Sequence, residues 1–209
     1  MGLTAPRDVP AGSLPGTSLM TGAILLAAGF SRRYGSVKLN AQLPGGLTIL
    51  QQSFTNIAQA FDEVIVAGRK DLFDLGTYDA LGLNPDNHKL VLCTDAESGM
   101  GHTLACGADA IPSHWQACFV CLGDMPFIAP ATLRSLQHYV TEQSLVVPVW
   151  HQQQGHPIGF GRDYFDALRQ CRGDTGARHV LRDATAITRV DVNDPGVIQD
   201  IDRPEDLPS

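Results

Sequence analysis

The chain has 209 residues, of which 44% are hydrophobic and 18% are charged, and its formal net charge at pH 7 is -7. This composition is ordinary for a soluble globular protein, and the length suits one large domain with a full core. The negative net charge argues against a general nucleic-acid-binding surface, so any attraction for an anionic substrate has to come from local cations. No stretch is long and apolar enough to span a membrane, and we expect a cytoplasmic protein.

The opening segment, residues 1–21, is rich in Pro, Gly, Ser and Thr. It lacks the basic start and the apolar centre of a secretory signal. We interpret residues 1–21 as a disordered leader. Residues 22–209 are assigned to a single domain, because no linker interrupts the pattern that follows.

After the leader, apolar runs alternate with segments of helical periodicity. In chain order, we expect a strand at 23–27, a helix at 47–61, strands at 63–67 and 90–93, a helix at 103–110, a strand at 117–122, a helix at 130–140, strands at 145–149 and 157–160, helices at 163–170 and 175–183, and a strand at 187–192. Continuous apolar strands that alternate with helices predict an α/β fold with a mostly parallel sheet.

The first strand leads into a short basic loop with the sequence Ala28-Gly29-Phe30-Ser31-Arg32-Arg33-Tyr34-Gly35-Ser36-Val37-Lys38. Small residues let backbone N–H groups approach a bound anion closely, and the three cations oppose its charge. The loop matches neither the Gly-Lys-Ser/Thr P-loop nor G-x-G-x-x-G. We interpret it as a grip for a nucleoside triphosphate, and the alternative is a plain basic surface loop.

Asp124 lies in the segment Cys121-Leu122-Gly123-Asp124-Met125-Pro126, just past the carboxyl end of a strand that we expect to be central. Ligands of open α/β sheets bind outside that edge. A carboxylate there is well placed to hold Mg²⁺ between phosphates. The alternative is a strand-end turn in which Asp124 caps its own backbone.

Two more carboxylates lie near the end of the chain, in Gln199-Asp200-Ile201-Asp202-Arg203-Pro204. If this segment is extended, Asp200 and Asp202 point the same way, because residues two apart share a face. They could then complete a Mg²⁺ site opposite Asp124. Equally, Asp202 or a neighbour could cap a short helix that starts at Pro204.

Gly99 and Gly101 precede a predicted helix in Ser98-Gly99-Met100-Gly101-His102-Thr103. Two glycines at a helix start form a region where a nucleotide can lie against backbone amides. The alternative is a plain turn in which Ser98 or Thr103 caps the helix.

Two later segments carry polar residues among glycines, and they contain His156 and Arg178. These two side chains could bind the phosphate of an acceptor substrate. A lone histidine is more often structural, and the remaining histidines lack the spacing of zinc ligands.

Cys118 and Cys121 have C-x-x-C spacing inside an apolar run. On a strand, residues three apart face opposite sides, so the two sulfur atoms cannot share a zinc ion or form a ready disulfide. Small buried apolar side chains in a reducing cytosol explain them better.

Six segments in this order, LAAGFSRRYGSVK, SGMGHTLACG, CLGDMP, GHPIGF, GDTGAR and DIDRPEDL, resemble the motifs of the MobA-like molybdopterin nucleotidyltransferases. The resemblance runs from about Ala23 to Leu207 and is strongest to the molybdenum cofactor cytidylyltransferases. It implies a Rossmann-like, three-layer α/β/α fold. It also implies Mg²⁺-dependent transfer of a nucleoside monophosphate to the terminal phosphate of a molybdopterin-type acceptor, and a molybdoenzyme could receive the product.

The resemblance also implies roles by position. The nucleotide would be lined by Leu26, Ala27, Ala28 and Gly29. Arg33 and Lys38 would hold the triphosphate and act in catalysis with Asp124, and the metal would be bound by Asp124 and Asp202, with Asp200 as a further candidate. Cytidylyl members tend to show Ala-Ala-Gly where guanylyl members tend to show Ala-Gly-Gly, so Ala28 favours CTP.

The sequence departs from the family pattern in three places, namely Tyr34, the inserted Pro44-Gly45-Gly46 and Arg203. These departures bear on the acceptor and on the second metal ligand. Three alternative functions stay open: GMP transfer to the same acceptor, cytidylyl transfer to another small phosphate, and a non-catalytic protein that carries the molybdenum cofactor.

Overall fold

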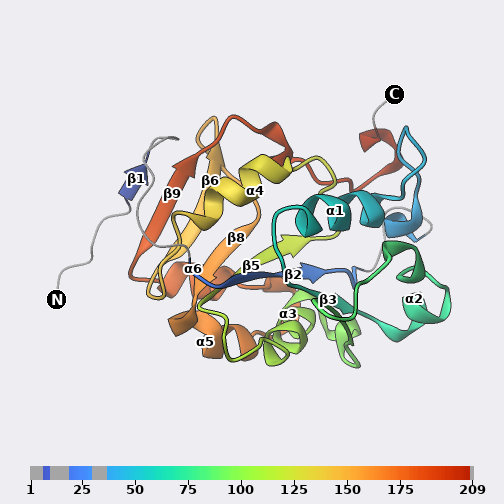
Figure 1. Ribbon diagram of the computed structural model, residues 1–209, viewed down its shortest axis with the longest axis horizontal. Helices are drawn as coiled ribbons and strands as arrows, with labels where there is room; N and C mark the ends of the chain where they lie inside the picture. The colour runs from blue at the N-terminus through green and yellow to red at the C-terminus, as the bar shows by residue number, and fades with distance from the viewer. Residues whose placement is uncertain (1–6, 10–18, 30–36, 208–209) are drawn as a thin grey trace.

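The computed structural model describes residues 7–9, 19–29 and 37–207 (Figure 1). Within this part of the chain, one nine-stranded sheet has the order β1-β9-β6-β8-β5-β2-β3-β4, and β7 pairs with β6. The strands are β1 (Arg7–Val9), β2 (Thr21–Leu26), β3 (Val64–Gly68), β4 (His88–Leu92), β5 (Ala117–Leu122), β6 (Leu145–Trp150), β7 (Gln153–Gln154), β8 (Ile158–Gly161) and β9 (Ile187–Asp191). β8 runs antiparallel to both of its neighbours, β5 and β6. The pairs β6–β9, β5–β2, β2–β3 and β3–β4 are parallel. The prediction of a mostly parallel sheet is confirmed.

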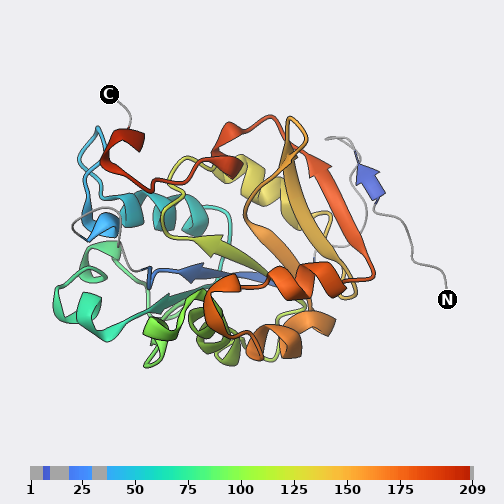
Figure 2. The same cartoon turned by 180° about the vertical axis from the view of Figure 1, so that it is seen from behind.

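Helices cover both faces of this sheet and give a three-layer α/β/α sandwich (Figures 1 and 2). On one face lie α1 (Ile49–Ala58) and α4 (Pro130–Gln137). On the other lie α3 (Met100–Asp109), α5 (Phe165–Arg169) and α6 (Arg178–Asp183). The short helix α2 (Lys70–Asp74) follows β3. The architecture that the sequence predicts is therefore present.

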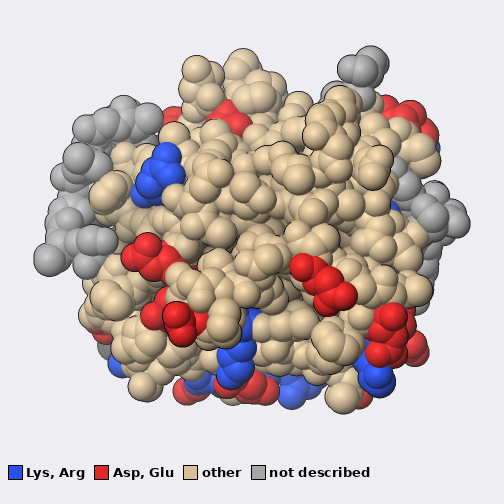
Figure 3. Space-filling model, turned by 45° about the vertical axis from the view of Figure 1, so that its right-hand side comes forward, with Lys and Arg blue, Asp and Glu red and all other residues tan. Residues whose placement is uncertain are grey.

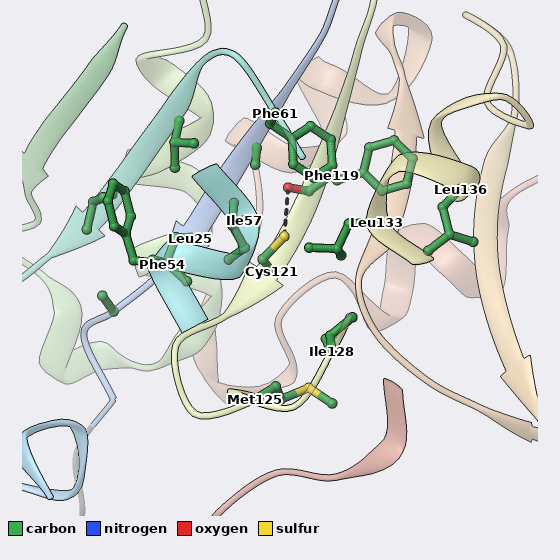
Figure 4. Close-up of a cluster of buried hydrophobic side chains, with 14 of the residues drawn as sticks. Leu25, Phe54, Ile57, Phe61, Phe119, Cys121, Met125, Ile128, Leu133 and Leu136 are labelled. Atoms are coloured by element: carbon green, nitrogen blue, oxygen red, sulfur yellow. Dashed lines mark hydrogen bonds between the residues drawn. The ribbon is translucent and has the colours of Figure 1, made fainter. Parts of the chain in front are cut away.

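Buried apolar side chains between the sheet and the helices α1 and α4 form the first hydrophobic layer of the protein, and they explain why these helices lie there (Figure 4). Their apolar residues recur at helical spacing and pack onto the upper face of the central strands. The contacts join Phe54, Ile57, Leu133 and Leu136 of the helices to Leu25, Phe119 and Cys121 of the sheet. The start of α1 is fixed by a capping box between Thr48 and Gln51, each side chain accepting from the other residue's backbone N–H.

Cys118 and Cys121 lie on opposite faces of β5, as their spacing predicts. Cys118 belongs to the layer under α3 and α5, whereas Cys121 belongs to the layer under α1. Both thiols are free and buried, and burial raises the pKa of each. They are small apolar packing groups and not reactive thiolates.

Residues 7–9 lie within the segment 1–21 that we interpret from the sequence as a leader. These residues form β1, which pairs in parallel with β9 from Arg7 opposite Thr188 to Val9 opposite Val190. A strand of three residues carries too little periodicity to be recognised in a sequence. Residue 21 also belongs to the sheet, as the first residue of β2. Residues 1–6 and 10–18 lie outside the described part of the chain.

The last two predicted helices begin later than expected. The segment 163–170 begins as a 3-10 turn, Arg162–Tyr164, and becomes α-helical only at Phe165. The segment 175–183 is α-helical only from Arg178. Gly173 and Gly176 have φ values of 67° and 54°, and a left-handed backbone cannot continue a right-handed helix.

The charged side chains are sparse on the face seen in Figure 3, where blue and red groups lie mostly toward the lower edge and uncharged residues fill most of the upper half. Attraction for an anionic substrate on this face would thus depend on individual cations. Among the described helices, none has the length and apolar character needed to cross a membrane.

Candidate active site

Asp124 lies two residues after the end of β5, at the carboxyl edge of the sheet between β2 and β8. Helix α1 holds the turn on both sides of this residue. The Ser53 hydroxyl lies 3.0 Å from the Gly123 carbonyl oxygen, and the Asn56 side-chain amide donates to the Pro126 carbonyl at 2.9 Å. The backbone turn that carries Asp124 is therefore held by polar contacts from a neighbouring helix.

Lys38 begins a 3-10 helix, Lys38–Asn40, that comes directly after the basic loop. Its ammonium donates to Asp124 Oδ2 at 2.8 Å and to Asp202 Oδ1 at 3.0 Å. The Lys38 side chain is only 11% exposed. Burial alone would lower the pKa of Lys38, but the charge and hydrogen bonds of Asp124, and then those of Asp202, outweigh it and raise the pKa. Lys38 is accordingly a fixed positive charge.

The C-terminal segment reaches this edge through a backbone contact. The Ile201 N–H donates to the Asp124 carbonyl oxygen at 2.9 Å, and the Ile201 side chain is fully buried. With the middle side chain buried, the carboxylates of Asp200 and Asp202 turn to the other side. The extended geometry on which the prediction depended is therefore present.

The carboxylate that caps the terminal turn is Asp206. Its Oδ2 accepts from the backbone N–H of Asp202 at 2.9 Å and from that of Arg203 at 2.8 Å. The 3-10 turn Pro204–Asp206 does exist, as the capping alternative required. The Asp202 side chain, however, faces Lys38 and leaves the capping role to Asp206.

Asp124, Asp200 and Asp202 together form a candidate metal site, because one oxygen of each lies within 4.8 Å of the others. A few carboxylates open to substrate oxygens suit Mg²⁺. Asp200 is exposed, yet partial desolvation and then the charge of Asp124 raise its pKa. A cation between these groups would relieve their repulsion, so the donor set fits a divalent metal ion.

A pocket of about 440 Å³ opens beside Lys38 and Asp124. It lies between the ends of β2 and β5 and the start of α3, whose first N–H groups have no partner within the helix. Its lining residues are Leu26, Ala28, Gly29, Lys38, Leu39, Ala96, Glu97, Gly99, Met100, Thr103, Leu122, Asp124 and Asp174. A pocket of this size suits a nucleotide-sized ligand.

Most residues predicted to contact a nucleotide line this pocket, but two do not. Ala27 is fully buried behind the pocket wall. Gly101 lies against the backbone of Arg172, where an added Cβ would come within 2.6 Å of a backbone atom. Gly99, with φ 117°, is the N-cap of α3, so neither Ser98 nor Thr103 caps that helix. Arg33, which we predicted to grip the triphosphate, lies outside the described residues.

A second pocket, of about 590 Å³, adjoins the first, and Leu26, Met100, Leu122 and Asp174 line both. His156 and Arg178, the predicted acceptor ligands, line this second pocket, as does Asp200. The Nδ1 atom of His156 is buried and has no hydrogen-bond partner among the described atoms. Burial lowers the pKa of His156, Arg178 adds to this, and Asp124 opposes it. The imidazole is therefore neutral, and it lines the pocket without a hydrogen-bond partner at Nδ1.

The residues of the pocket wall that the sequence analysis did not assign include Glu97, Met100 and Asp174. Asp174 could have been found in the sequence, because it lies between two glycines, Gly173 and Gly176, in a loop of the kind that carries ligand-binding residues. Gly99 allows the two loops to approach, because a Cβ there would collide with the Asp174 carboxylate. This contact joins segments that are far apart in the sequence, so neither loop indicates it alone.

A disulfide joins Cys93, just after β4, to Cys106 on α3, with the two Cα atoms 5.8 Å apart. The sequence analysis did not predict it, because the pairing depends on how α3 packs beside β4. The twelve-residue loop that it closes contains five lining residues of the first pocket, which are Ala96, Glu97, Gly99, Met100 and Thr103.

Reduction of this disulfide should lower the free energy of unfolding by about 3 kcal/mol, because a closed loop of this length restricts the unfolded chain. Urea unfolding with and without dithiothreitol measures the difference. The Cys106→Ser variant is the matched control, and its transition should not respond to the reductant. Identical transitions for the reduced and oxidised wild-type protein would show that the bond contributes nothing to stability.

Comparison with known proteins places this chain in a family. The model of the MobA-like NTP transferase domain matches residues 23–190. The purine catabolism protein PucB of Bacillus subtilis is 30% identical over 189 residues, which cover 88% of this chain and 92% of PucB. A probable molybdenum cofactor guanylyltransferase of Methanosarcina mazei is 29% identical over 136 residues, which cover 65% of this chain and 60% of that protein.

The fold is shared with solved structures as well. Rv0371c from Mycobacterium tuberculosis H37Rv superposes with a TM-score of 0.73 at 24% identity, over 91% of this chain and 96% of that one. The same protein in complex with manganese gives a TM-score of 0.73 at 23% identity, over 90% and 95% of the two chains. Because the family match spans most of the chain and includes Lys38, Asp124, His156 and Arg178, this protein belongs to the MobA-like NTP transferase family of nucleotidyltransferases.

Proposed function

We propose that this protein transfers CMP from CTP to the terminal phosphate of molybdopterin or the molybdenum cofactor and releases pyrophosphate. The observation that carries the proposal is the cluster of Lys38, Asp124 and Asp202 beside two adjoining pockets. The first pocket is available for the nucleotide and the second for the acceptor, and the Lys38 ammonium lies in the wall of the first pocket. A carrier protein would not need a buried lysine held between two carboxylates.

Asp124 and Asp202, with Asp200 as the third candidate, would hold Mg²⁺. The donor set supports this assignment. Rv0371c, which shares the fold, has been solved in complex with manganese. When bound, the ion supplies positive charge against the phosphate oxygens. The chain itself fixes the carboxylates through α1 and through the Ile201–Asp124 backbone contact.

Lys38 would neutralise and orient the triphosphate, and Arg33 is proposed as its partner. The attacking acceptor phosphate has a second pKa of about 6, so it is largely ionised at neutral pH and needs no protein base. The main obstacle is repulsion between two polyanions. Fixed cations remove this obstacle and hold the α-phosphorus in line with the incoming oxygen.

The second pocket has the character that a fused-ring acceptor with a phosphate requires. Val147, Ile158 and Phe160 provide apolar walls, and Arg178 provides a cation for the phosphate. The neutral His156 side chain lines the same pocket and adds an uncharged polar group to its wall. Asp174 and Met100 lie where the two pockets meet, so the acceptor can approach the nucleotide there.

The base preference rests on Ala28, which is 4% exposed and lines the first pocket. The resemblance to cytidylyl members favours CTP at this position, and we propose that the Ala28 methyl group narrows the wall where glycine would leave room for the larger purine. The second candidate function is GMP transfer to the same acceptor. It is favoured by the similarity to the probable molybdenum cofactor guanylyltransferase of Methanosarcina mazei. The two functions differ only in the nucleotide that this wall admits.

A competition assay with molybdopterin and equal CTP and GTP should give a kcat/KM ratio of at least about 10 in favour of CTP, since a one-carbon difference in a pocket wall changes selectivity by about 10- to 200-fold. The Ala28→Gly variant should shift the ratio toward GTP. Labelled product and pyrophosphate release are the readouts. A preference for GTP in the wild-type protein would establish the second candidate function, and nucleotide binding without pyrophosphate release would indicate a carrier.

A further inference from the structure

The hydrogen-bond ladder between β2 and β3 changes at its carboxyl end, next to the nucleotide pocket. The two strands are parallel, with Leu26 opposite Ala67. One residue further, the Ala27 N–H still donates to the Ala67 carbonyl oxygen at 2.8 Å. In a regular parallel ladder, the Ala27 carbonyl would then accept directly from the N–H of Arg69.

The hydroxyl of Tyr78 stands in the place of that direct bond. It accepts from the Arg69 N–H at 2.9 Å and donates to the Ala27 carbonyl oxygen at 3.0 Å. One oxygen atom therefore separates the two strands at the last residue before Ala28. Both backbone groups remain paired, so the separation leaves no buried polar group unsatisfied.

Gly68 makes room for the Tyr78 ring. A Cβ at residue 68 would lie 2.6 Å from Tyr78 Cζ and 2.7 Å from the hydroxyl oxygen, which is closer than real Cβ contacts allow. Tyr78 itself is 2% exposed and packs in the first hydrophobic layer. Burial raises the pKa of its hydroxyl, so the group stays protonated and can donate. The ring is thus held firmly in one position.

We propose that Tyr78 is a positioning residue for the nucleotide: its hydroxyl replaces the last ladder bond between β2 and β3 and so sets where Ala28 and Gly29 meet the ligand. Ala28 and Gly29 both line the first pocket, and they follow Ala27 directly. If Arg69 bonded Ala27 directly, the end of β2 would move toward β3 and away from the Asp124 side. Misplacement of about 1 Å at a reactive site can cost about 100-fold in rate. The inference rests on the proposed nucleotide site and adds a determinant of its shape.

The test measures binding of CTP and of GTP, each with Mg²⁺ and without an acceptor, so that neither nucleotide is consumed. Tyr78→Phe keeps the ring and removes the hydroxyl together with both of its backbone hydrogen bonds, and the displaced strand end should weaken binding of the preferred nucleotide at least about tenfold. Gly68→Ala retains the hydroxyl but displaces the ring, and it should weaken binding similarly. Tyr139→Phe is the matched control, because Tyr139 is a buried tyrosine of the same layer.

Thermal unfolding separates positioning from stability. A purely structural Tyr78 would give a lower Tm and unchanged nucleotide affinity in Tyr78→Phe, and that result would overturn the inference. If Tyr78→Phe does not fold, unchanged affinity in Gly68→Ala would overturn it equally. Absence of binding of either nucleotide by the wild-type protein would instead overturn the proposed function, together with any positioning role that depends on it.

Discussion

Lys38→Met should lower kcat/KM for nucleotidyl transfer by about a thousandfold while the fold is retained. Two unit charges about 4 Å apart at an effective dielectric constant of about 20 interact by about 4 kcal/mol, which corresponds to about a thousandfold in rate. Methionine keeps the apolar stem that packs beside the pocket and removes only the charge. Pyrophosphate release is the readout, and urea unfolding checks the fold.

The same variant should change how the protein binds a metal ion in the absence of nucleotide. The Lys38 ammonium bridges Asp124 and Asp202, so it competes with a divalent cation for the same oxygens. Lys38→Met should therefore bind Mn²⁺ alone at least about tenfold more tightly, as judged by electron paramagnetic resonance of the free ion. The rate and the metal affinity should move in opposite directions.

Lys70→Met is the control for this pair of measurements. Lys70 is an exposed lysine that pairs with Asp74 one helical turn away, and such surface pairs contribute little. Neither its turnover nor its Mn²⁺ affinity should differ from the wild type. Near-normal turnover in Lys38→Met would remove this lysine from the mechanism.

The sequence predicted those parts of the fold that depend on local patterns. The bounds of β5 agree with the predicted strand 117–122, because a continuous apolar run between polar turns is unambiguous. The position of Asp124 at the sheet edge followed from that strand, and the shared face of Asp200 and Asp202 followed from the period of extended chain. Each of these predictions uses residues that are close in the sequence.

What the sequence could not predict depends on packing between distant segments. Nothing near Tyr78 indicates that its hydroxyl lies between Ala27 and Arg69. The Cys93–Cys106 bond likewise depends on the position of α3. Lys38 was predicted as a phosphate ligand, but its two carboxylate partners come from residues 86 and 164 positions away. These contacts are products of the tertiary structure.

Asp124→Asn should be the most damaging single change in the metal site. The substitution keeps the shape of the side chain and removes its charge, so the turn held by Ser53 and Asn56 should remain. We expect Mn²⁺ binding in the presence of CTP to weaken by at least about 100-fold, because loss of a residue that only supports a metal ligand already costs about 10- to 100-fold. We expect Mg²⁺-dependent turnover to fall by about a thousandfold.

A comparison of the two remaining carboxylates would then assign the second ligand. Asp202 is held beside Asp124 by the shared Lys38 ammonium, whereas Asp200 is more exposed and lines the acceptor pocket. Asp202→Asn should therefore weaken Mn²⁺ binding more than Asp200→Asn does. Asp183→Asn, a substitution on the surface next to Arg182, is the control for a general loss of negative charge. If Asp124→Asn titrates with Mn²⁺ as the wild type does, the metal is held elsewhere, and the cluster at the sheet edge serves only to fix Lys38.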